Sequence, residues 1–214
     1  LFQARKDKEW FVLSESRVAG EPTQDRQGPF VSIGPNRSYS VGLLPHKETG
    51  LAYYWASSAD GAHFVVGQAG NKSAKSAAYK KVSIQTFQLE KDAVATATSE
   101  QGAHVLVGSN AGKGYLAFTR LSGANNDKQV AYIGQLHNTT TTDEQGLQTT
   151  VAGGYEVVLG GSSQGVFDRI DRYQLSKSAA RPVYVGIRGL DNYVVHEGQQ
   201  VGPYTPFELC CFVP

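Results

Sequence analysis

The residues best suited to chemistry lie in Gly161-Ser162-Ser163-Gln164-Gly165, which matches the Gly-x-Ser-x-Gly pattern of a nucleophile elbow. In an elbow, a strained turn between a strand and a helix exposes the serine hydroxyl. A strand-like run precedes Ser163, and helix-like spacing follows it. The acids that precede His196 and could complete a triad are Asp168, Asp171 and Asp191. The surrounding α/β pattern is missing, and the same residues suit a flexible loop. A serine hydrolase is therefore the third of three functional hypotheses, and the chain is expected not to be an enzyme.

A second glycine-rich segment, Gly108-Ser-Asn-Ala-Gly112-Lys113-Gly114, resembles a phosphate-binding loop at first sight. The Walker pattern requires four residues between its glycines, and this segment has three. Gly114 also stands where the magnesium-binding Ser or Thr belongs. The segment therefore predicts a hairpin turn, and no nucleotide cofactor is expected.

Metal-binding spacing is absent from the sequence. A zinc site needs three or four closely arranged ligands, usually with a short-spaced pair among them. No His or Cys pair has that spacing, and the acidic residues do not follow a calcium-loop pattern. Cys210 and Cys211 are neighbours, whose side chains point to opposite faces of a strand, so they predict two thiols in a reducing compartment. We expect neither a metal nor a cofactor.

Composition restricts the class of protein further. The 214 residues carry 20 Lys and Arg against 19 Asp and Glu, a net charge of +1, which disfavours nucleic-acid binding. No run of 18 apolar residues occurs, so no membrane insertion is expected. The sequence contains no methionine, which suggests a single domain over residues 1–214 excised from a longer polypeptide.

Short runs rich in Val, Ile, Thr, Tyr and Phe alternate with turn residues, as in all-β proteins. The runs are 30–33, 51–55, 63–66, 82–87, 104–107, 115–119, 130–133, 155–159, 183–187, 193–195 and 207–213. Helix-like spacing occurs only over 88–99 and 165–176. We therefore predict an all-β fold, an antiparallel β-sandwich or β-barrel with at most one or two short helices. Tyr53 and Trp55 should share one strand face and Tyr54 the other.

Glycines six residues apart flank four apolar runs, at 28–34, 61–67, 102–108 and 154–160. The two middle copies both contain Ala-His, which places His63 and His104 at equivalent positions. The intervals between copies are irregular, and they predict neither a propeller nor a solenoid. Convergent strand-and-turn chemistry is the favoured interpretation, and duplication of 61–73 and 102–114 is the alternative.

Polar, uncharged loops are the candidate binding surfaces, because a rigid sheet scaffold leaves function to its loops. Asn36, Asn71 and Asn138 begin Asn-x-Ser/Thr sequons, which predict exposed loops and leave glycosylation open. Two further loops are expected over 123–128 and 138–145. The candidate receptor-binding residues are Asn110, Lys113, Asn125, Asn126, Asp127, Thr140 and Asp143.

The Gly/Thr/Ser/Asn-rich β pattern, the lack of spaced cysteines and the terminal segment 202–214 together resemble the protruding or spike domains of non-enveloped RNA virus coat proteins. Such domains occur in astroviruses, hepeviruses, caliciviruses and tetravirus-like insect viruses. The resemblance implies a capsid domain on the virion surface, folded in the host cytoplasm, which forms dimers or trimers. It also implies that the domain binds a host receptor and neutralising antibodies. A β-rich carbohydrate-binding lectin of a cellular organism is the second hypothesis.

Overall fold

The computed structural model describes most of the chain as antiparallel β-sheet, and the described part contains no helix, hence none able to cross a bilayer. The described residues are 2–18, 21–34, 52–69, 72–90, 92–142, 144–175, 180–196 and 198–205. The strand predicted over 207–213 lies outside these ranges, as do Cys210 and Cys211 and the sequons at Asn36 and Asn71.

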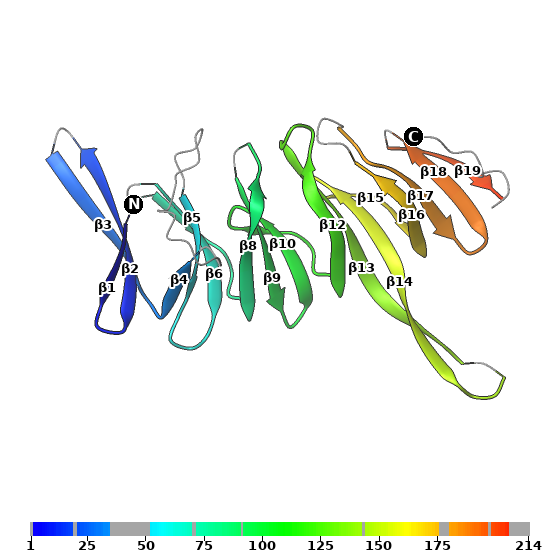
Figure 1. Cartoon of the computed structure of the whole chain (residues 1–214), viewed down its shortest axis with the longest axis horizontal. Coiled ribbons are helices and arrows are strands. Elements are labelled where there is room, and N and C mark those ends of the chain that lie inside the picture. Colours follow the sequence, from blue (N-terminus) through cyan, green and yellow to red (C-terminus); the bar gives the residue numbers. More distant parts are fainter. Residues whose placement is uncertain are drawn as a thin grey trace. The chain divides into compact units, whose positions relative to one another are not determined.

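The strands form five sheets, each completed before the next begins (Figure 1). Sheet A contains β1 (Phe2–Lys6), β2 (Glu9–Val18) and β3 (Glu21–Phe30). Sheet B contains β4 (Ser32–Gly34), β5 (Ala52–Ser57), β6 (His63–Ala69) and β7 (Lys72–Lys75). Sheet C contains β8 (Lys81–Gln88), β9 (Ala93–Ser99), β10 (Gly102–Val107) and β11 (Asn110–Ala111). Sheet D contains β12 (Ala117–Ala124), β13 (Gln129–Thr142), β14 (Gln148–Leu159) and β15 (Ser162–Phe167). Sheet E contains β16 (Arg169–Gln174), β17 (Val183–Arg188), β18 (Asp191–His196) and β19 (Gln199–Tyr204).

The all-β prediction is confirmed, and the two segments with helix-like spacing form no helix in the described residues. The first, over 88–99, contains the end of β8 and the whole of β9. The second, over 165–176, contains the end of β15 and the whole of β16. Its helix-like spacing comes from a β-bulge between Asp171 and Gln174, because an extra residue in a strand shifts the alternation by one and places Ile170 and Tyr173 three positions apart.

The single domain predicted over 1–214 contains two compact units, Leu1–Gly114 and Tyr115–Pro214. The first unit holds sheets A, B and C, and the second holds sheets D and E. Neighbouring sheets within a unit pack face to face through a shared apolar core, as in a β-sandwich. Within each sheet, the strands follow one another in sequence as a simple meander. This is also the topology of a propeller blade.

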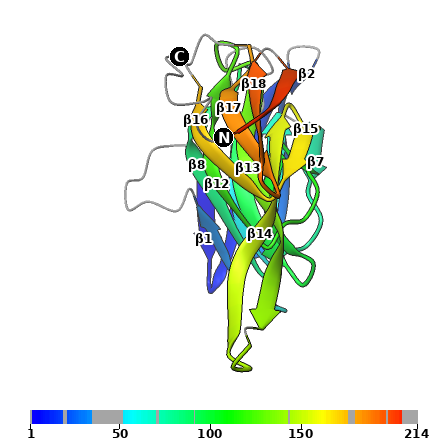
Figure 2. The same cartoon turned by 90° about the vertical axis from the view of Figure 1, so that its right-hand side faces the viewer.

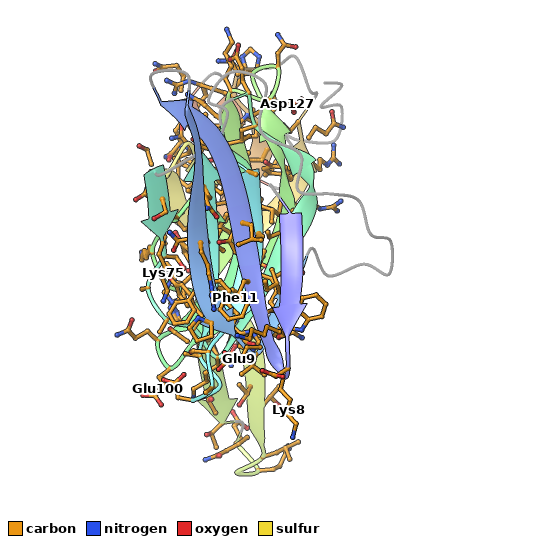
Figure 3. The ribbon with its side chains drawn as sticks, turned by 90° about the vertical axis from the view of Figure 1, so that its left-hand side faces the viewer. Lys8, Glu9, Phe11, Lys75, Glu100 and Asp127 are labelled. Carbon is orange, nitrogen blue, oxygen red and sulfur yellow. The ribbon has the colours of Figure 1, made fainter. Side chains whose placement is uncertain are left out.

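In the first unit, sheet B is buried on both faces. Tyr54 faces the core shared with sheet A, whereas Tyr53 and Trp55 face the core shared with sheet C, as the alternation predicts. Figure 3 shows the charged side chains Lys8 and Glu9 and the Phe11 side chain of sheet A. The Arg26 guanidinium lies 3.6 Å from the centroid of the Phe11 ring. This contact covers the ring with a cation.

An aromatic residue at the end of one sheet connects it to the next. Phe30, Tyr79, Tyr115 and Phe167 hold these positions, and all four are buried. Three of these rings pack edge to face against the ring of a tyrosine on the second strand of the following sheet. The pairs are Phe30 with Tyr54 at 6.3 Å, Tyr115 with Tyr132 at 5.8 Å, and Phe167 with Tyr184 at 5.8 Å between centroids. This edge-to-face geometry is the one that aromatic quadrupoles favour.

Sheets D and E repeat each other at an offset of 52 residues. Tyr115 and Phe167 are equivalent, and so are the sequences Tyr132-Ile-Gly134 and Tyr184-Val-Gly186. Each glycine makes room for the connecting aromatic ring, because an added Cβ would overlap it. The predicted glycine-flanked copies at 61–67, 102–108 and 154–160 include residues of the third strands of sheets B, C and D, whereas 28–34 spans the connection between sheets A and B.

Gly186→Ala should lower the free energy of unfolding by about 1–3 kcal/mol, the usual cost of inserting a methyl group into a packed core. Gly134→Ala should behave alike, because the Tyr115 ring covers that glycine. Urea denaturation monitored by far-UV circular dichroism measures the free energy of unfolding of both variants. Ser162→Ala, at an exposed position on β15, is the control, and equal stability of all three variants would contradict the packing described.

Alkaline pH should destabilise the protein through two tyrosines of the second unit. Burial raises the pKa of Tyr173 to about 12 and that of Tyr184 to about 12. The unfolded chain ionises these phenols near pH 10, so the unfolded state releases its protons first and stability falls as pH rises from about 10 to 12. Urea denaturation at a series of pH values measures the slope, and Tyr184→Phe should reduce it.

Candidate functional site

The predicted site residues fall in both units. Asn110 lies on β11, in the hairpin correctly predicted from the glycine-rich segment, and Lys113 follows it; both side chains are exposed. Asn125, Asn126 and Asp127 form the turn between β12 and β13, and Figure 3 labels Asp127. Asp143 lies outside the described residues.

The β12–β13 turn has an unusual backbone. Asn125, Asn126 and Asp127 have φ values of 52°, 54° and 64°, a left-handed conformation that Asn and Asp tolerate better than other side chains. The Lys128 amide donates a hydrogen bond to the Ala124 carbonyl oxygen at 3.1 Å, which closes the turn. The loop predicted over 123–128 is therefore a tightly structured turn around these three residues.

The second predicted loop, over 138–145, is mostly strand. β13 continues to Thr142 and pairs with β14 from Gln148 onward. Threonine is β-branched and favours extended backbone, which explains the error. The distal parts of both strands, residues 137–142 and 148–153, have no third strand beside them among the described residues, because β12 pairs only as far as Gln135 and β15 as far as Tyr155.

We call this two-stranded extension the ribbon, and it projects beyond the rest of sheet D (Figures 1 and 2). Thr140 is exposed on it, and its Oγ1 lies 3.0 Å from Oγ1 of Thr150 across the pair. Leu147, near the tip, is 66% exposed. The ribbon and the 125–127 turn lie at opposite ends of β13, so the structure does not combine these predicted residues into one site.

The nucleophile elbow does not form. Ser163 lies within β15, paired with the β14 strand, and the following residues are strand rather than helix. Its hydroxyl oxygen accepts a hydrogen bond from the Gly165 amide at 3.3 Å. Of the three candidate acids, Asp168 accepts a hydrogen bond from the Gly189 amide and Asp171 pairs with Arg169. The motif therefore forms part of a β-strand in the described structure.

His104 has a defined environment. Its Nδ1 lies 3.2 Å from the Gly112 carbonyl oxygen, so this nitrogen carries the proton, and Ser99 donates its hydroxyl to Nε2 at 2.8 Å. The arrangement ties β10 to its neighbouring hairpins. In the described ranges no three His, Cys, Asp or Glu side chains gather as metal ligands would.

Two adjoining hollows in the second unit form a groove along β12 and β16. One has a volume of about 530 Å³ and is lined by Arg120, Leu121, Ser122, Tyr173, Gln174 and Leu175. The other has about 500 Å³ and is lined by Thr119, Arg120, Ile133, Tyr155, Arg169, Ile170, Asp171, Arg172 and Tyr173. Arg120 and Tyr173 border both. Volumes of this size are typical of small-molecule sites.

A β-bulge on each strand places an arginine at this groove. The register of β12 shifts between Thr119 and Ser122, and that of β16 shifts between Asp171 and Gln174. Within these bulges, Arg120 has φ 57° and Arg172 has φ 50°. They are equivalent residues at the 52-residue offset. Left-handed backbone costs a residue with a Cβ about 1–2 kcal/mol, and strain of this kind is concentrated at ligand-binding sites.

The groove is cationic. No carboxylate in the described part of the chain forms an ion pair with Arg120 or Arg172, whereas Arg169 pairs with Asp171 at 2.9 Å. Beside Arg120, the Tyr173 hydroxyl is buried and has no hydrogen-bond partner among the described residues. Burial raises the pKa of that phenol, while Arg120 partly offsets the effect. The arrangement can bind an anion, and no three metal-ligating side chains gather among its described lining residues.

The sequence interpretation missed Arg120 and Arg172. Their signal is the shared spacing, because each arginine follows its connecting aromatic residue, Tyr115 or Phe167, by five positions. The glycine-based repeat drew attention to other strands.

Comparisons of the chain with protein-family models, with curated proteins and with solved structures find no match. The fold itself defines the class, an all-β protein built from consecutive antiparallel meander sheets.

Replacing either bulge arginine by glycine should stabilise the protein. Arg120→Gly and Arg172→Gly remove the Cβ that makes a left-handed backbone unfavourable, which should raise the free energy of unfolding by up to about 1 kcal/mol. Chemical denaturation measures the change. A loss of more than about 1 kcal/mol in both variants would show that these arginines support the fold rather than being strained within it.

Proposed function

We propose that this chain is a non-enzymatic domain that projects from the surface of a non-enveloped viral particle and attaches it to a host cell receptor. The ribbon is the observation that carries the proposal, because a two-stranded extension beyond a packed sheet offers contact area without contributing to the core. The packed sheets of the second unit supply the scaffold that such a contact surface requires.

The chemistry of the ribbon suits recognition of a partner. Exposed threonines such as Thr140 and Thr150 present hydroxyl groups, and Leu147 adds an exposed apolar contact near the tip. A mixture of adaptable hydrogen-bonding groups and an apolar anchor is characteristic of binding surfaces. Neutralising antibodies would meet the same protruding surface.

Self-association belongs to the proposal. The outer edges of the ribbon offer backbone groups without strand partners in the described structure, and such edges can pair with a second chain. A homodimer or trimer at the virion surface, as the resemblance implies, would bury one of these edges.

A carbohydrate-binding lectin of a cellular organism is the second candidate. One observation favours it, namely the groove with Arg120 and Tyr173, whose polar and aromatic lining suits a sugar ring. No such observation favours serine hydrolysis, because Ser163 lies in a strand.

Shortening the ribbon should abolish cell attachment and leave the sheets folded. In the variant, residues 139–151 are replaced by Asn-Gly, because Asn138 and Ala152 are paired across the strands and a two-residue Asn-Gly turn can join them. Fluorescent beads coated with the full chain should bind a subset of lines in a panel of vertebrate and insect cells. Beads coated with the shortened chain should bind at least about tenfold less, as expected when multivalent contacts are lost.

The matched control is Lys81→Ala with Gln101→Ala, which changes exposed residues of the first unit outside the predicted binding loops and should keep attachment. Circular dichroism of each variant should retain the sheet spectrum. Attachment by the shortened chain as strong as that of the full chain would refute the role of the ribbon, and failure of the full chain on every line would refute attachment itself.

A further inference from the structure

We propose that the groove along β12 and β16 binds an acidic sugar, a hydroxylated ring that bears a carboxylate, with Arg120 and Arg172 holding the acid group. The inference goes beyond the proposed attachment function, because it concerns a different part of the second unit from the ribbon.

The first argument is charge that the described structure leaves without an ion-pair partner. Both arginines are exposed at the groove, and no described carboxylate forms an ion pair with them. A guanidinium donates two parallel hydrogen bonds to a carboxylate, a geometry that a bulge can help to aim. A strained arginine occurs at equivalent positions of sheets D and E. The groove therefore has two guanidinium groups that can donate hydrogen bonds.

The second argument is the rest of the lining. Thr119, Ser122 and Gln174 provide groups that hydrogen-bond hydroxyls, while Tyr155 and Tyr173 provide aromatic surface for the C–H face of a ring. Each hollow is open to solvent and measures about 500 Å³ or slightly more, which is large enough to seat one sugar ring. An acidic sugar matches all three kinds of group at once.

The lining also disfavours other anions. Asp171 borders the groove and neutralises Arg169, which leaves too little positive charge for a polyphosphate or a nucleic acid. β12 and β16 are the outer strands of their sheets, but their bulges interrupt the regular edge that an added peptide strand would need. A compact ligand with one negative charge remains the best match.

The test compares the full chain with two pairs of variants on an array of glycans. The glycans carry terminal sialic or uronic acids, and each has a neutral partner whose carboxylate is reduced to an alcohol. Wild type should bind acidic members at least about tenfold more tightly than their neutral partners, as expected for a charge-assisted bidentate contact. Arg120→Gln and Arg172→Gln should each weaken that binding about tenfold.

Arg181→Gln is the matched control, because it removes an equal charge from an exposed residue of the second unit that does not line the groove; its affinity should stay within about twofold of wild type. Arg120→Gly and Arg172→Gly serve as the second pair. They relieve left-handed strain while removing the guanidinium, so their loss of binding cannot be ascribed to misfolding when circular dichroism is unchanged.

Equal binding of acidic and neutral glycans, absence of binding, or full binding by the groove variants would overturn the inference. So would complete competition by millimolar inorganic sulfate or by an acidic peptide, which would show binding of anions in general. Cell attachment by the wild-type chain without acidic-glycan binding would reject this inference and leave the proposed function standing. Glycan binding retained by the shortened-ribbon chain would establish the groove as a separate site.

Discussion

The contact between a connecting aromatic ring and the second strand of the next sheet is the interaction on which the architecture depends. Phe30, Tyr115 and Phe167 each lie edge-on to a tyrosine of that strand. Phe30 and Phe167 are the last residues of β3 and β15, so each ends one sheet and packs against the next, whereas Tyr115 stands just before β12 and packs against sheet D. Glycines at 134 and 186 are required by the close approach of these rings to the backbone.

The same connection determines where the groove forms. β12 and β16 are the first strands of their sheets, and each follows a buried aromatic residue. In both strands the bulge comes only a few residues after that aromatic residue. The bulges place Arg120 and Arg172 at the groove beside Leu121 and Tyr173, which line it as well. Strain at the arginines is balanced by the packing around them, which holds the two strands in place.

Much of the scaffold is predictable from sequence, because alternation of apolar residues reports directly on strand faces. The opposed faces of Tyr53 and Tyr54 are an example. Three features escape that argument for physical reasons. A bulge converts strand periodicity into helix-like spacing at Ile170 and Tyr173, and the threonine tract extends a strand where polarity suggested a loop. The groove depends on φ values and on sheet-to-sheet packing. The five-residue spacing from Tyr115 to Arg120 and from Phe167 to Arg172 marks equivalent positions but encodes neither of them.

The connectivity has a consequence for how the chain acquires its structure. Every strand pairs with its immediate neighbour in sequence, so the hydrogen-bonded ladders in the described part of the chain are short-range. Closing the short connection between two such strands costs little entropy. Each sheet can therefore assemble as soon as its strands leave the ribosome, and a newly emerging sheet finds an aromatic side chain already in place to pack against.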